Sequence, residues 1–166
     1  MLPAFFAMWS MVAIAHTAVP VSLEKLDSQL KSQGFRSNLK RIKREGYYSA
    51  NKGYSETKFG AWVDISAFQG QTPGRITQIR FLGINCVVSK LPNSIAAESV
   101  EKELAAAFPP LFGEVLPDQI INAMKKKDSG GDSLSPNGFR KIKVSRSEPY
   151  CDSTSGGWSV SVDLFF

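Results

Sequence analysis

Two stretches of the chain have apolar residues that recur with a period of two. Apolar side chains occupy every second position from Phe59 to Ile65 and again from Trp158 to Phe166. A period of two places alternate side chains on opposite faces of a β-strand. Each stretch is therefore predicted to be a strand with one buried face. The pattern also favours a strand just after Tyr47, before the first of these, and another over 139–146, where Ile142 and Val144 point inward.

The stretch 75–90 is the most apolar after the first twenty residues, and its apolar residues lie on both faces. Leu82 and Ile84 point one way, whereas Ile79 and Phe81 point the other. A strand that is apolar on both faces is normally central and covered. We therefore expect this strand in the middle of the sheet.

Three helices are predicted from capping residues and helical spacing. In the first, Ser22 caps a helix that buries Leu23, Leu26 and Leu30 and ends at Gly34. The second runs from Asn93 or Ser94 to Phe108, where Pro109-Pro110 stops it, and the third is short, with Pro117 at its first position and Lys125–Lys127 at its end. The predicted order α-β-β-β-α-α-β-β indicates an α+β fold, an antiparallel sheet of about five strands with helices packed on one face.

The N-terminal segment is read as an export leader. No charged residue occurs from Leu2 to Leu23, and the small residues Ala13 and Ala15 have the spacing that a signal peptidase requires. We predict a signal peptide at 1–18 and a single globular domain at 19–166. An uncleaved membrane anchor is the alternative, because about 20 apolar residues can span a bilayer and no Lys or Arg precedes the apolar run.

Export affects how the cysteines and the only histidine are interpreted. Cys86 and Cys151 are the two cysteines, and in an oxidising compartment they are predicted to form a disulfide; in a reducing one they would be buried thiols. His16 lies in or beside the leader, so the mature chain has no imidazole for catalysis or metal binding. We predict no cofactor and no metal.

Other chemical motifs are weak. Gly131–Leu134 spells the nucleophile block of GDSL esterases, but no histidine follows it, and we interpret it as part of a Gly/Ser/Asp loop at 128–138. Carboxylate pairs remain open: Asp64, Asp152 and Asp163 lie near tryptophans, as in a glycoside hydrolase cleft. Loop oxygens of Asp128 and Asp132 could hold a hard cation, although the spacing of a calcium-binding loop is absent.

Positive charge is concentrated in one region. The net charge is +5, and residues 25–58 hold nine Lys and Arg against three Asp and Glu. Cations interleaved with aromatic rings suit anionic polymers. The candidate ligand-binding residues are Lys40, Arg41, Lys43, Arg44, Tyr47, Tyr48, Lys52, Tyr54, Lys58 and Trp62. A second basic strip, Arg140, Lys141, Lys143 and Arg146, extends this patch if the strands adjoin.

The sequence thus predicts an exported, periplasmic or secreted, non-catalytic binding or accessory module. Its basic, aromatic face would bind an anionic envelope polymer, a lipid headgroup or an acidic protein. Two alternatives remain: an exported hydrolase that uses carboxylates, and a membrane-anchored or nucleic-acid-binding protein if the leader is retained.

Overall fold

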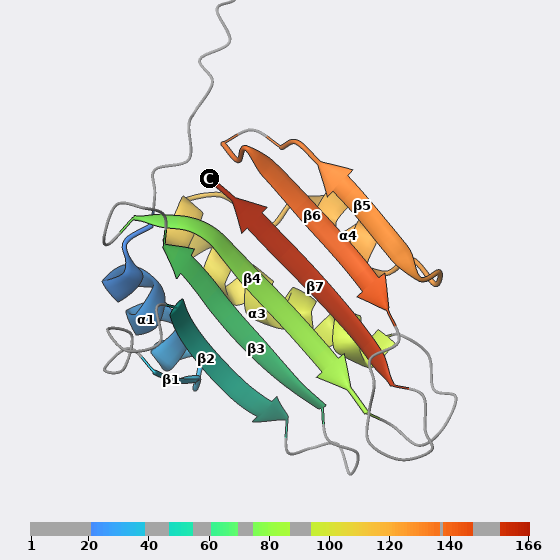
Figure 1. Cartoon of the computed structure of the whole chain (residues 1–166), viewed down its shortest axis with the longest axis horizontal. Coiled ribbons are helices and arrows are strands. Elements are labelled where there is room, and N and C mark those ends of the chain that lie inside the picture. Colours follow the sequence, from blue (N-terminus) through green and yellow to red (C-terminus); the bar gives the residue numbers. More distant parts are fainter. Residues whose placement is uncertain are drawn as a thin grey trace, which may run out of the picture.

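A seven-stranded antiparallel sheet forms one layer of the protein, and helices form the other, as the computed structural model in Figure 1 shows. The structure describes residues 21–38, 47–54, 61–69, 75–86, 94–136, 138–147 and 157–166. The strand order across the sheet is β1-β2-β3-β4-β7-β6-β5. The described part therefore forms a two-layer α+β domain.

The described elements have the following bounds. The helices are α1 (Leu23–Ser32), α3 (Ser94–Phe112) and α4 (Asp118–Met124). The strands are β1 (Arg36–Ser37), β2 (Tyr47–Tyr54), β3 (Ala61–Gln69), β4 (Ile76–Asn85), β5 (Gly130–Leu134), β6 (Lys141–Ser147) and β7 (Trp158–Phe165).

The predicted element order is confirmed, with two strands added. The extra strands, β1 and β5, form the two edges of the sheet. The interpretation of Gly131–Leu134 as a loop was wrong, because these residues pair with Ile142–Ser145 of β6. A short edge strand with two glycines has too few alternating positions to show a period of two.

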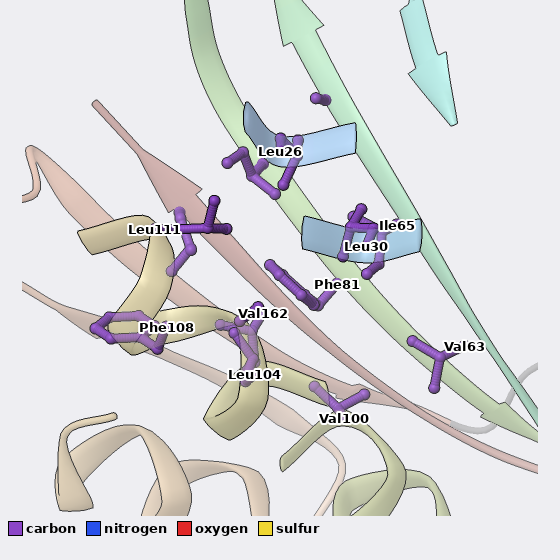
Figure 2. Packing of buried hydrophobic residues seen from close by; sticks show 14 of the residues in the cluster. Leu26, Leu30, Val63, Ile65, Phe81, Val100, Leu104, Phe108, Leu111 and Val162 are labelled. Atoms are coloured by element: carbon purple, nitrogen blue, oxygen red, sulfur yellow. The ribbon is translucent and has the colours of Figure 1, made fainter. Parts of the chain in front are cut away.

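The hydrophobic core lies between the sheet and the helices. Val63 and Ile65 of β3, Phe81 of β4 and Val162 of β7 are fully buried, and Figure 2 shows α1 and α3 directing their own apolar side chains at this face. The helix side chains labelled there are Leu26, Leu30, Val100, Leu104, Phe108 and Leu111. Each fully buried side chain of this size stabilises the fold by about 1.5–3 kcal/mol.

Helix α1 begins and ends where the sequence predicts. The Ser22 Oγ accepts a hydrogen bond from the Lys25 N–H at 3.2 Å, which satisfies one of the unpaired donors of the first turn. Gly34 follows the helix with φ of 87°, a conformation that glycine adopts without steric cost.

Helix α3 does not stop at Phe108 as predicted, but continues through Pro109 and Pro110 to Phe112. Pro110 has no N–H to donate to the carbonyl of Ala106, and the side chain of Gln29 in α1 donates to that oxygen instead, at 3.3 Å. The Gly113 N–H then donates to the Pro109 oxygen at 2.8 Å. A partner from another helix therefore lets the last turn form.

Two predictions concern residues only partly described. Among the described residues, no helix is long and apolar enough to cross a membrane, and the predicted leader lies outside them. Cys86 follows β4, and no described cysteine is free. Cys151 is not among the described residues, so the disulfide stays a prediction.

Candidate ligand-binding face

The basic, aromatic segment predicted to bind a ligand is described only in part. Tyr47 and Tyr54 lie at the two ends of β2, and Trp62 lies near the start of β3. Outside the described residues lie Lys40, Arg41, Lys43, Arg44 and Lys58.

Tyr48 and Lys52 point towards the helices and not into solvent. Tyr48 is fully buried, and its hydroxyl donates to Asp27 Oδ1 at 3.0 Å. The prediction that Tyr48 contacts a ligand was therefore wrong, because alternation along β2 places it in the core. The Lys52 ammonium lies 2.8 Å from Glu103 Oε1 and 5.5 Å from the centre of the Phe35 ring.

The Asp27 carboxylate is the centre of a buried network between α1 and the sheet. Its Oδ1 also accepts from Ser37 at 2.5 Å, and its Oδ2 lies 2.6 Å from the Lys31 ammonium. Burial alone would raise the pKa of Asp27, but the hydrogen bonds from Lys31, Ser37 and Tyr48 together outweigh it and lower the pKa below 3.8. Burial and the nearby carboxylate raise the pKa of the Tyr48 hydroxyl.

This network makes the stability of the fold depend on pH. Because the pKa of Asp27 is lower in the folded protein, its contribution is present above 3.8 and is lost as the pH falls through the folded value. We expect Asp27→Asn to cost about 1–3 kcal/mol at neutral pH, and less as the pH falls below 3.8. Urea unfolding followed from pH 7 to pH 2 measures this. A cost that stays constant over that range would contradict it.

The second basic strip does not join the first. Strands β4 and β7 separate β6 from β3 and β2. Arg146 points inward, and its side chain is 2% exposed. Its guanidinium donates to the oxygen of Ala123 at 2.8 Å and to Asp132 Oδ2 at 2.6 Å. Arg146 is therefore a structural residue that ties α4 and β5 to β6.

Asp128 and Asp132 were considered as ligands of a metal cation. In the structure, cationic side chains of the protein bind these two carboxylates instead. The Lys126 ammonium lies 2.5 Å from Asp132 Oδ1, and Arg146 contacts both carboxylates. Hydrogen bonds from Lys126 and then Arg146 lower the pKa of Asp132. In the described ranges, no group of three or more His, Cys, Asp or Glu side chains could hold a metal ion.

The face of the sheet opposite the helices is left uncovered by every described element. Helices α3 and α4 pass behind the strands in Figure 1, and their contacts are with the buried face. Strand pairing forms two adjacent rows on the uncovered side. One row consists of Gln78, Phe165 and Lys141, and the other of Arg80, Asp163 and Lys143; we call these six residues the open-face patch.

An ion pair holds the centre of the open-face patch. Asp163 Oδ1 accepts from Arg80 Nε at 2.6 Å and from Gln78 Nε2 at 2.7 Å, and the Asp163 side chain is only 3% exposed. Lys141 and Lys143 are exposed, and neither forms an ion pair with a described residue. Their Cα atoms are about 7 Å apart, because they are two residues apart on one strand.

Of the carboxylates considered for hydrolysis, Asp64 and Asp163 lie on strands that are not adjacent. Asp64 and Asp163 lie on the same face, but β4 separates their strands and their rows differ by two residues. Their Cα atoms are therefore about 12 Å apart, and the Asp163 carboxylate is turned to Arg80 and Gln78. Asp152 lies outside the described residues.

Sequence reasoning named Lys141, Lys143 and Asp163, but it did not place them together or include Arg80 and Phe165. One signal was available: Arg80 and Asp163 are opposite charges, and each is the one charged residue of its strand. Their pairing requires the strand order, which no local pattern specifies. Comparison with known proteins found no matching family model and no significant match among curated proteins or solved structures.

Proposed function

We propose that the protein is an exported, non-catalytic binding module that holds an anionic component of the cell envelope on the open face of its sheet. One observation carries the proposal. Lys141 and Lys143 are exposed beside Arg80, on a face that no described element covers. Export is inferred from the apolar segment 1–18. An exported protein meets its ligand in the periplasm or outside the cell.

The charge distribution of this face supports the proposal. The cationic side chains at outward positions of the described strands are Arg36, Arg80, Lys141 and Lys143. The anionic ones are Asp64 and Asp163, and the second is already paired with Arg80. This face therefore attracts anions, and the attraction weakens with salt because the screening length is about 8 Å at physiological ionic strength.

The contacts and positions of the acidic side chains favour binding over hydrolysis. Asp163 is engaged by Arg80 and Gln78, and Asp64 lies on a strand that β4 separates from β7. A general acid and a second carboxylate across a sugar bond are thus not assembled in the described part of the sheet.

The test replaces both exposed lysines with glutamine. Lys141→Gln with Lys143→Gln is expected to weaken binding to immobilised dextran sulfate about tenfold at moderate salt. That corresponds to about 0.7 kcal/mol for each lysine, which is typical of exposed ion pairs. Retention is measured as a function of salt concentration.

The matched control removes the same charge elsewhere. Lys102→Gln with Lys127→Gln alters two exposed lysines that are not on the open face, and it should bind nearly as well as the wild type. Equal weakening in both double variants would mean that only net charge matters. That result, or undiminished binding by the first variant, would refute the proposed face.

A further inference from the structure

We infer that the ligand of the open-face patch is an acidic polysaccharide, whose sugar ring packs on Phe165 while its carboxylates meet Lys141, Lys143 and Arg80. The inference rests on the proposed function and specifies the class of polymer.

The position of Phe165 is the first reason. Phe165 is half-buried in the sheet face, with Lys141 opposite it on one side and Gln78 on the other. The C–H groups on one side of a sugar ring form an apolar surface that gains dispersion energy against an aromatic ring. Lys143 and Arg80 lie in the next row, so cations surround the place where the ring would pack.

The hydrogen-bonding groups of the face are the second reason. Ser66, Ser145 and Ser161 are half-buried at outward positions near the open-face patch, and Gln78 lies within it. Hydroxyl and amide groups both donate and accept, which suits sugar hydroxyls. A polyphosphate at neutral pH offers almost only acceptors, so it cannot donate hydrogen bonds to the serine and amide oxygens of this face.

The exposure of apolar residues argues against a membrane surface. Interfacial binding to a bilayer requires exposed apolar side chains that enter the headgroup region. Among the described residues, the one exposed large hydrophobic side chain is Val115, which lies between α3 and α4 and not on the sheet. Phe68, Leu82, Ile84 and Phe165 on the open face are all half-buried.

The test compares three probes and two variants. Binding of the full chain to polygalacturonate, to polyphosphate and to vesicles of phosphatidylglycerol is measured by titration calorimetry. Phe165→Leu keeps an apolar side chain but removes the flat ring, and we expect it to weaken polygalacturonate binding five- to tenfold. Its binding to polyacrylate, which carries carboxylates but no sugar ring, should not change, because that binding depends on the lysines.

Phe166→Leu is the matched control, because Phe166 is the next residue and packs in the aromatic cluster with Phe112 and Phe139 on the helix side. It should bind polygalacturonate like the wild type, provided that both variants unfold cooperatively on heating. Binding to polyphosphate or vesicles without polygalacturonate would overturn the inference and keep the proposed function. An unchanged affinity of Phe165→Leu would also overturn the inference. Failure to bind any anionic probe, dextran sulfate included, would overturn both.

Discussion

Replacing Gly83 with alanine is expected to lower the free energy of unfolding by about 2–3 kcal/mol. Gly83 lies on the buried face of β4, beside Ala96 and Val100 of α3. A Cβ atom there would lie 2.6 Å from the Ala96 oxygen and 2.6 Å from Val100 Cγ2. Because the oxygen belongs to the helix backbone, α3 must move away from the sheet to admit one methyl group. Urea unfolding measures the loss.

Gly53→Ala provides the control for this substitution. Gly53 also lies within a strand, but a Cβ added there meets no atom within 4 Å. We expect its free energy of unfolding to change by less than about 0.5 kcal/mol. If Gly83→Ala were as mild as Gly53→Ala, α3 would not be packed against β4 as described.

Replacing Arg146 with methionine is expected to destabilise the protein by about 2–4 kcal/mol. Methionine fills much of the space of the arginine side chain, so the loss reports mainly the polar contacts. The oxygens of Ala123 and Asp128, which accept from the guanidinium at 2.8 and 3.0 Å, would lose this donor. Asp132 would lose one of its two cations. Thermal and urea unfolding both measure the effect.

Two further variants separate the stability contributed by the hydrogen bonds of the guanidinium from that contributed by its positive charge. Arg146→Lys keeps the charge but cannot reach all of these acceptors at once, and it should recover only part of the stability. Arg140→Met removes an exposed arginine just before the same strand and should change stability little. If Arg146→Met resembled Arg140→Met, the buried guanidinium would not join α4 and β5 to the sheet.

Periodicity and capping were sufficient to predict most of the fold. The period of two placed Val63, Ile65, Val160 and Val162 on the buried face, and Ser22 and Gly34 marked the ends of α1. The predictions that failed concerned contacts between residues that are distant in the sequence. Gln29 supports the last turn of α3 from 77 residues away, and no local rule about proline includes such a partner.

The candidate site was predictable in its chemistry but not in its arrangement. Basic residues on β6 were recognised and Ile142 and Val144 were predicted to point inward, but this alternation was not extended to Arg146, which was grouped with Lys141 and Lys143. Tyr48 and Lys52 were misplaced because no alternation of apolar and polar residues marks the buried face of β2. The pair of Arg80 and Asp163 joins residues 83 apart, and it exists only because β7 lies beside β4.

The position of β7 between β4 and β6 also determines when the sheet can be completed during folding. Strands β1 to β4 form one group, which precedes β7 in the chain by more than 70 residues. Strands β5 and β6 form a second group, which also precedes β7. In the sheet, β7 joins these two groups. Until β7 is available, each group has an exposed edge and an incomplete core. Such long-range closure is slow, because the entropy of a long loop is lost before its contacts form. The chain therefore reaches its folded state only once its last strand is available.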